Sequence, residues 1–217
     1  MTVRLLITDD HEVVRQGLRL YLRRDHEIEV VGEAADGEEA VELARSLGPD
    51  VVLMDLLMPR MDGIEATATI RAEMPEVEVV ALTSVLEDVS VTGAIKAGAI
   101  GYLLKDTKAE ELCRAVKGAA AGQVQLAPEA AARLMSEVRV PEGPEELTPS
   151  ETGILKRVAR GQANKEIARD LFVEERTVKS HVTSILRKLG VKSRTQAALY
   201  AIRTGLVSVD ELSEESW

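Results

Sequence analysis

Six polar residues that could do chemistry follow apolar runs in the first half of the chain. They are Asp9 and Asp10, Asp55, Thr83 and Ser84, and Lys105. Each stands at the carboxyl end of a run with the composition of a buried strand, which is where open parallel sheets place their binding sites. If these runs are neighbours in one sheet, carboxylates, hydroxyls and an ammonium converge on one crevice. Such a crevice would hold a divalent cation and a phosphoryl group.

The carboxylates predict a magnesium site. Mg²⁺ prefers hard oxygen ligands, binds through one or two carboxylates and keeps several waters. We expect Asp10 and Asp55 to be direct ligands and Asp9 to act through a water. The backbone carbonyl of Leu57 would add a further oxygen. Mn²⁺ would suit the same ligands.

A phosphoryl group beside these carboxylates needs positive charge and hydrogen-bond donors. Lys105 would pair with one phosphoryl oxygen, and the hydroxyl of Thr83, next to Ser84, would donate to another. Taken singly, paired acids after a strand usually cap a loop or a helix, and a lysine at a strand end is usually solvated. Because these groups follow successive strands, the sequence favours a shared site over coincidence.

The elements that must position these residues alternate between strands and helices. The expected strands are 3–8, 28–34, 51–55, 77–82 and 100–104, and the expected helices lie near 11–24, 37–47, 64–74, 87–97 and 108–121. Repeated strand–helix units with continuously apolar strands predict a parallel sheet that helices cover on both faces. Residues 1–121 should therefore form a doubly wound α/β domain with a five-stranded, flavodoxin-like sheet.

From residue 148 the pattern is that of an all-α domain. Thr148, Pro149 and Glu151 have the types and spacing of a capping box with proline at the first helical position. The first expected helix follows this capping box and ends before Gly161. Three more helices are expected at about 164–172, 175–189 and 194–204. A tight connection around 172–174 would make residues 148–206 a small helix-turn-helix domain.

The net charge of −10 conceals an uneven distribution. Residues 1–127 carry 13 Lys and Arg against 23 Asp and Glu, whereas residues 148–206 carry 12 against 5. The proline-containing segment 122–147 is expected to be a linker with one short helix, and 207–217 an acidic tail. The basic module is the candidate for binding a polyanion, and the opposite charges would favour docking of the two modules.

Composition indicates a globular protein of the cytoplasm. The chain is 45% hydrophobic and 29% charged, and no apolar stretch approaches the roughly 20 residues that span a membrane. The N-terminus lacks a signal-peptide pattern. The single cysteine, Cys113, cannot form an internal disulfide, which fits a reducing compartment. We expect a cytoplasmic protein without a membrane partner.

The acidic module resembles the receiver domains of bacterial two-component response regulators. The resemblance rests on Asp9–Asp10, Asp55 with Met58–Pro59 and Asp62–Gly63, Thr83–Ser84, and Gly101–Lys105. It implies that Asp55 accepts a phosphoryl group from a sensor histidine kinase, in a reaction that the receiver assists. It also implies that Thr83 and Tyr102 move together when the phosphoryl group arrives, which would reshape the surface around residues 84–108.

The basic module resembles the LuxR-type helix-turn-helix of NarL/FixJ-type regulators. The resemblance rests on Asn164–Ala168, Arg176–Val182, Leu189–Val191 and Ser193–Arg194. It implies sequence-specific binding to double-stranded DNA. Because relatives pair two such domains through the last helix, we expect a homodimer when Asp55 is phosphorylated, with RNA polymerase as a further candidate partner. The alternative is that the alanines of that helix pack inside the monomer.

The helix at 175–189 has the two faces that a recognition helix needs. One face must be apolar for its own domain, and the other must be polar and cationic for the major groove. Base contacts are assigned to Lys179, Ser180 and Thr183. Phosphate contacts, which add affinity but little sequence information, are assigned to Lys165, Thr177, Arg187, Lys188 and Lys192. The alternative is a solvated basic face.

Two other functions compete with this interpretation. A phosphatase or haloacid-type hydrolase would usually carry a general acid two residues after Asp55, where this chain has Leu57. A phosphorylation-independent DNA-binding regulator with a vestigial receiver would not need the full set of acids, hydroxyl and lysine. The sequence therefore favours a transcription regulator, not an enzyme, whose DNA binding is controlled by phosphorylation of Asp55.

Overall fold

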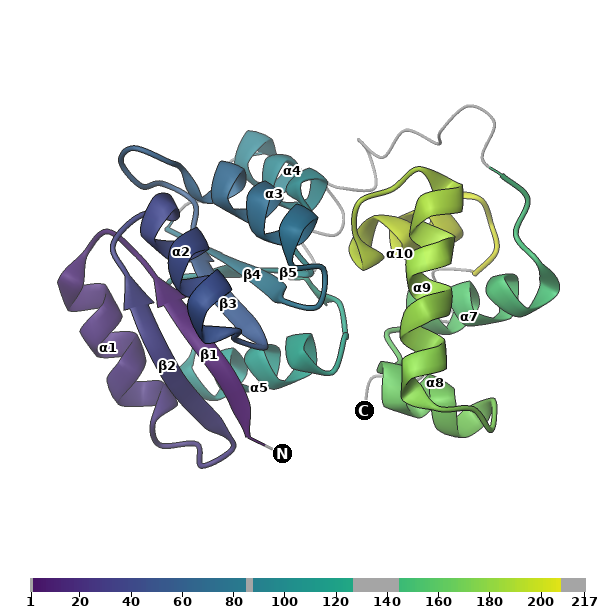
Figure 1. Ribbon diagram of the computed structural model, residues 1–217, viewed down its shortest axis with the longest axis horizontal. Helices are drawn as coiled ribbons and strands as arrows, with labels where there is room; N and C mark the ends of the chain where they lie inside the picture. The colour runs from purple at the N-terminus through teal and green to yellow at the C-terminus, as the bar shows by residue number, and fades with distance from the viewer. Residues whose placement is uncertain (1, 85–87, 127–144, 208–217) are drawn as a thin grey trace.

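The structure is a computed structural model that describes residues 2–84, 88–126 and 145–207. Within these ranges the chain forms an α/β domain and an all-α domain, which Figure 1 shows side by side. The helix expected in the linker and the acidic tail from residue 208 lie outside the described residues. No helix in the described part of the chain is both long enough and apolar enough to cross a membrane.

The first domain is built on a parallel sheet with the strand order β2-β1-β3-β4-β5-β6. The strands are β1 (Val3–Thr8), β2 (Ile28–Ala34), β3 (Val51–Asp55), β4 (Glu78–Thr83), β5 (Gly101–Leu104) and β6 (Gln125–Leu126). The first five strands confirm the expected doubly wound sheet, since all of their pairings are parallel. The short β6 is an addition that the sequence does not predict, because no apolar run marks it.

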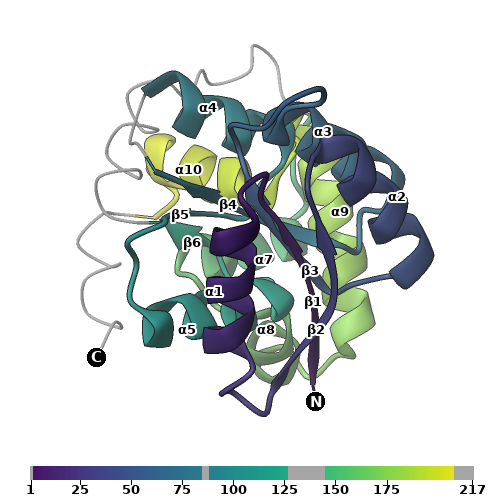
Figure 2. The same cartoon turned by 90° about the vertical axis from the view of Figure 1, so that its left-hand side faces the viewer.

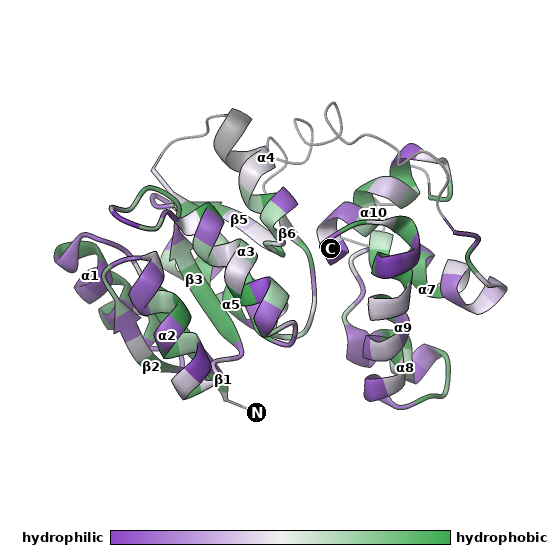
Figure 3. Cartoon of the chain, turned by 45° about the horizontal axis from the view of Figure 1, so that its top comes forward, coloured by the Kyte–Doolittle hydropathy of each residue, from purple (hydrophilic) through white to green (hydrophobic). Residues whose placement is uncertain are grey.

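Helices cover both faces of this sheet, as Figure 2 shows. They are α1 (Glu12–Leu22), α2 (Gly37–Leu47), α3 (Gly63–Glu73), α4 (Asp88–Ala97) and α5 (Ala109–Ala120). Successive residues of a strand point to opposite faces. In β1, Leu5 packs on the side of α1 and α5, and Leu6 packs on the side of α2 and α3. Both leucines are fully buried, and Figure 3 shows most of β3 in the green of hydrophobic residues.

The second domain consists of four helices around a core of its own. They are α7 (Pro149–Ala159), α8 (Asn164–Asp170), α9 (Glu175–Leu189) and α10 (Arg194–Arg203). The core includes buried Leu155 of α7, Ile185 of α9 and Ala201 of α10. The capping box at the start of α7 is confirmed, because Thr148 and Glu151 each accept a hydrogen bond from the other's backbone N–H.

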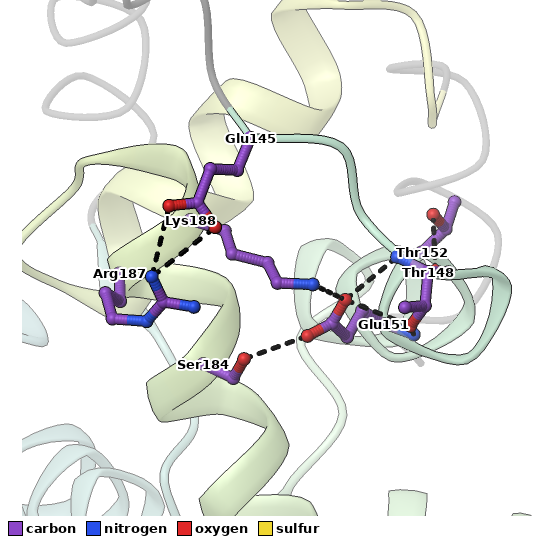
Figure 4. Close-up of polar contacts among 7 residues, drawn as sticks. All are labelled: Glu145, Thr148, Glu151, Thr152, Ser184, Arg187 and Lys188. Atoms are coloured by element: carbon purple, nitrogen blue, oxygen red, sulfur yellow. Dashed lines mark hydrogen bonds and ion pairs between the residues drawn. The ribbon is translucent and has the colours of Figure 1, made fainter.

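A buried ion pair ties α7 to α9, as Figure 4 shows. Lys188 Nζ lies 2.7 Å from Glu151 Oε2, and the Ser184 hydroxyl donates to Glu151 Oε1 at 2.9 Å. The carboxylate also accepts from the backbone N–H of Thr148 at 2.8 Å. The hydrogen bond from Lys188, followed by that from Thr148, lowers the pKa of Glu151 to about 2. This carboxylate is therefore held charged between α7 and α9.

The turn after β3 requires glycine at position 63. A Cβ atom there would collide with the carbonyl oxygen of Asp55, the residue that ends β3. The Gly63 N–H also donates to the Leu56 carbonyl at 3.1 Å. Asp62 caps the following helix by accepting from Glu65 N at 2.8 Å. The start of α3 is thus set directly against the strand end that carries Asp55.

We expect Gly63→Ala to lower the free energy of unfolding of the α/β domain by about 1–3 kcal/mol, because the strand end must shift to admit the methyl group. Gly17→Ala is the control, since a Cβ atom at Gly17 of α1 meets nothing within 4 Å. The control should raise stability by about 0.5–1 kcal/mol through its helix preference. Denaturant unfolding measures both changes, and equal effects of the two variants would contradict the close approach at Gly63.

A second prediction concerns acid sensitivity. Because the pKa of Glu151 in the folded domain, about 2, lies below its ordinary value of 4.5, its stabilising effect is present above pH 4.5 and is lost as the pH falls from 4.5 towards 2. Glu151→Gln should lower the free energy of unfolding by about 3 kcal/mol at neutral pH and flatten this acid limb. Glu145→Gln should change it by under about 1 kcal/mol, because the Glu145–Arg187 pair is exposed. Thermal melts across this pH range measure the loss of stability. If Glu151→Gln and Glu145→Gln both lost stability with falling pH as the wild type does, the prediction would be wrong.

Candidate functional site

The lysine that follows β5 lies between two buried carboxylates. Lys105 Nζ is 2.7 Å from Asp9 Oδ2 and 2.7 Å from Asp55 Oδ2. Asp9 is fully buried, and Asp55 is only 3% exposed. The three residues meet because the carboxyl ends of parallel β1, β3 and β5 lie at the same edge of the sheet. The structure therefore brings together three of the residues that the sequence assigns to one site.

Burial and charge act in opposite directions on these groups. Burial raises the pKa of Asp55, and the hydrogen bond and charge of Lys105 offset that rise only in part. For Lys105, burial alone would lower the pKa, but the hydrogen bonds to Asp55 and Asp9 outweigh it, so the pKa lies above its ordinary value. The lysine therefore stays charged at neutral pH, and the site keeps an ammonium for a further anionic group.

Asp10 and His11 extend the site beyond its buried part. Asp9, Asp10 and His11 each offer one ligand atom, and these atoms lie within 4.8 Å of one another. His11 Nδ1 is 2.7 Å from Asp10 Oδ1, and His11 N donates to Asp9 Oδ1 at 2.9 Å. This density of hard carboxylate oxygens fits a divalent cation such as Mg²⁺. The sequence analysis missed His11, although its place directly after two acids could have indicated it.

The other residues expected at the site lie around this centre. Leu57 is 64% exposed, and its N–H lies 3.4 Å from Asp55 Oδ1. Thr83 is buried at the end of β4, where its carbonyl accepts from Lys105 N at 2.7 Å, and Ser84 is exposed. Tyr102 of β5 is fully buried beneath α4. Leu57, Thr83 and Ser84 lie at or just after the ends of β3 and β4, whereas Tyr102 lies within β5.

The residues assigned to DNA are mostly exposed. In α9, Val178 and Ile185 are buried while the three residues assigned to base contacts are exposed. These are Lys179, Ser180 and Thr183. Exposed residues assigned to phosphates are Lys165, Thr177, Arg187 and Lys192. α9 thus has the two faces expected of a recognition helix.

Lys188, which the sequence assigns to a DNA phosphate, has a partner inside its own domain. Its side chain is 17% exposed and pairs with the buried Glu151 carboxylate, so its charge is already compensated inside the domain. Spacing along a helix could not show this, because the partner comes from α7. Arg187, its neighbour, forms an exposed ion pair with Glu145 at 3.1 Å and keeps an exposed side chain.

The two domains meet where α10 contacts α4 and β5, and Figures 1 and 2 both place α10 beside these elements. Leu199 of α10 is 4% exposed and belongs to the same apolar cluster as Tyr102 and Ile95. The Thr195 hydroxyl donates to the Ile100 carbonyl at 3.1 Å. The side chains of α10 are therefore shared between domains, because Ala197, Ala198 and Ala201 pack inside the second domain.

Positive charges of the second domain act on one buried carboxylate of the first. Glu78 at the start of β4 has its pKa raised by burial, and the positive charges of Arg71, Arg194 and Lys179 oppose that rise. Arg194 and Lys179 belong to the second domain, so their charges reach the first domain here. Docking through the opposite net charges of the two domains stays a prediction. Among the described residues, the domains meet through apolar packing and hydrogen bonds of α10 and also through Asn164 of α8, whose N–H donates to the Ala121 carbonyl.

Replacing Lys105 with methionine should destabilise the first domain and strengthen cation binding. Without the ammonium, the carboxylates of Asp9 and Asp55 lose their partner, so the free energy of unfolding should fall by about 3–5 kcal/mol in chelator. Added Mg²⁺ should then raise the melting temperature of the variant more than that of the wild type. Lys108→Met is the control, because Lys108 is exposed. An unchanged response to Mg²⁺ would contradict a shared site for lysine and cation.

Comparisons with known proteins agree on both domains. The family model for the response regulator receiver domain matches residues 5–117, and the model for bacterial regulatory proteins of the luxR family matches residues 145–201. The transcriptional regulatory protein LiaR of Bacillus subtilis is 47% identical over 212 residues, which cover 95% of this chain and 100% of that protein. The response regulator protein VraR of Staphylococcus aureus is 43% identical over 208 residues, with the same two coverages.

Solved structures of response regulators are also similar. The response regulator ChrA of a heme-sensing two-component system matches with a TM-score of 0.54 and 39% identity, over 95% of this chain and 99% of that chain. RcsB, seen as two dimers bound to two parallel DNAs, matches with a TM-score of 0.56 and 25% identity, over 94% of this chain and 99% of that chain. The chain therefore belongs to the two-component response regulators that join a receiver domain to a LuxR-type DNA-binding domain and act in transcription.

Proposed function

We propose that Asp55 is the phosphoacceptor of this regulator and that a sensor histidine kinase supplies the phosphoryl group in the cytoplasm. The observation that carries the proposal is the position of Lys105, 2.7 Å from both Asp9 and Asp55 at one edge of the sheet. A nearly buried carboxylate beside an ammonium and further acids has the neighbours that a transferred phosphoryl group needs. Asp10 is partly exposed and Ser84 is exposed, which leaves the site open to a partner protein.

In the transfer, a carboxylate oxygen of Asp55 forms a bond to phosphorus while the phosphorus–nitrogen bond to the kinase histidine breaks. The departing imidazole takes up a proton. Mg²⁺ or Mn²⁺, when bound, neutralises charge on the phosphoryl oxygens. Asp10 and Asp55 would hold the cation directly, with Asp9 acting through water and Leu57 through its carbonyl. Lys105 would pair with a phosphoryl oxygen that the cation leaves free.

Thr83 and Ser84 supply the hydroxyls that would bind the remaining phosphoryl oxygens. Thr83 ends β4, and β4 pairs with β5 so that Ala81 lies opposite Tyr102. A movement of Thr83 towards the phosphoryl group would therefore alter packing around Tyr102. Since Tyr102 shares its cluster with Leu199, the change would reach α10 directly. We infer that phosphorylation weakens the docking of α10.

On the DNA-binding side, we propose α9 as the recognition helix. Lys179, Ser180 and Thr183 would contact base edges, and Lys165, Thr177, Arg187 and Lys192 would contact phosphates. Lys188 is left out of this set because Glu151 already neutralises it. Release of α10 would allow two chains to pair on DNA, an arrangement that the RcsB dimers on DNA support by similarity. RNA polymerase is the partner we expect at a regulated promoter.

The conservative variant Asp55→Asn tests this function. The wild type, incubated with acetyl phosphate and Mg²⁺, should gain the mass of one phosphoryl group and bind a selected DNA duplex more tightly. The variant should show neither change, because an amide oxygen is a poor nucleophile. Asp106→Asn should behave like the wild type, since Asp106 is exposed beside Lys105 and lies outside the proposed phosphoryl site.

Intact-protein mass spectrometry and DNA titration provide the measurements. An adduct of equal yield on Asp55→Asn would exclude Asp55 as the acceptor. Equal DNA affinity of wild type and Asp55→Asn in the presence of an active kinase would instead favour the alternative, a DNA-binding regulator with a vestigial receiver.

A further inference from the structure

The chain that leaves the receiver domain makes a turn at Gly122 that ends α5. Gly122 has a φ angle of +75°, the left-handed conformation that favours glycine. Its N–H donates to the Ala119 carbonyl at 2.8 Å, and Gln123 N donates to the Gly118 carbonyl at 2.8 Å. This pair of hydrogen bonds closes the helix and fixes the direction in which the chain departs.

The same turn is held by the DNA-binding domain. Asn164, the first residue of α8, donates its backbone N–H to the Ala121 carbonyl at 3.3 Å. Its side chain covers Gly122 so closely that a Cβ atom there would lie 2.7 Å from Asn164 Nδ2. Asn164 cannot easily move away, because its Oδ1 accepts from Arg194 Nη1 at 2.8 Å. Arg194 is itself 5% exposed and donates to the Gln162 carbonyl.

Beyond the turn, the chain first contacts the DNA-binding domain and then pairs with the receiver sheet. Val124 packs against the core of the DNA-binding domain. The next two residues form β6, which extends the receiver sheet by pairing with β5, so that Gln125 lies opposite Gly101 and Leu126 opposite Tyr102. Residues 121–126, which we call the junction segment, are therefore bonded to α5, α8 and β5 within six positions.

We propose that the junction segment is a latch that keeps the DNA-binding domain closed on the receiver until β5 shifts. The segment touches β5 at Tyr102, the residue whose packing the proposed function changes on phosphorylation. It touches the helix-turn-helix at Asn164, the start of α8. A shift of β5 would pull on β6 and so on the turn beneath Asn164. This inference rests on the proposed control by phosphorylation, and it assigns the coupling to a specific backbone segment.

Gly122→Ala tests the latch in the full-length, unphosphorylated protein. The methyl group would both strain the left-handed turn and displace Asn164, so the domains should separate. Gly205→Ala is the matched control, because Gly205 has a φ angle of +73° and nothing lies within 4 Å of a Cβ atom there. It carries the same backbone strain without the contact across the junction.

Small-angle X-ray scattering should show a larger radius of gyration for Gly122→Ala than for the wild type and for Gly205→Ala. The affinity of unphosphorylated Gly122→Ala for a DNA duplex selected by the wild type should rise by roughly 5–30-fold, the factor expected for about 1–2 kcal/mol of lost contact. Asn164→Ala, which removes the covering side chain and leaves the turn intact, should expand the protein likewise. It keeps the test decisive if Gly122→Ala fails to fold.

Unchanged dimensions in whichever of Gly122→Ala and Asn164→Ala folds would overturn the latch, and so would an equal expansion of Gly205→Ala. If the variant expanded but its affinity for DNA did not rise, the latch would not control DNA binding, and the proposal would also be overturned. A failure of the proposed function would give a different result. If Gly122→Ala expands and binds DNA more tightly while the phosphorylated wild type does neither, the latch exists but phosphorylation does not open it.

Discussion

The ammonium of Lys105 between the carboxylates of Asp9 and Asp55 is the interaction on which the rest of the structure depends. Buried carboxylates at a sheet edge repel one another, and they are tolerated because a cation lies within hydrogen-bond distance of both. The same positive charge makes the site receptive to a phosphoryl group. Both the stability of the domain and the binding of a phosphoryl group therefore require a positive charge at position 105. The close approach of Gly63 to the end of β3 holds the acceptor in place.

The path from this site to the DNA-binding domain is short and consists of packed elements. β4 and β5 carry the site residues Thr83 and Lys105 at their ends, and Tyr102 lies within β5. Tyr102 is fully buried in one cluster with Leu199 of α10, so the receiver core packs directly against the helix that docks on it. A change at the strand ends is thus transmitted through a tightly packed interior, which responds to displacement as a unit.

The sequence predicted what depends on periodicity and strand polarity, and it missed what depends on contacts between distant segments. The sites of Asp55 and Lys105 followed from apolar runs that end at one edge of a parallel sheet. The burial of Leu199 against the receiver could not be read from its helix, where a leucine equally suits the core of its own domain. Lys188 was assigned to DNA from its charge, and its pairing with Glu151 could not be foreseen because Glu151 lies on another helix. The short β6 has no periodicity to detect.

Hydrogen exchange of the full-length protein, with and without a phosphodonor and Mg²⁺, tests the central claim most directly. The account predicts that phosphorylation of Asp55 increases exchange in the peptides that cover α10 and β5 together, because their shared packing is loosened. Asp55→Asn should show no such increase. If the phosphorylated wild type kept the exchange of both peptides unchanged while carrying a full phosphoryl load, the coupling described here between the acceptor site and α10 would be wrong.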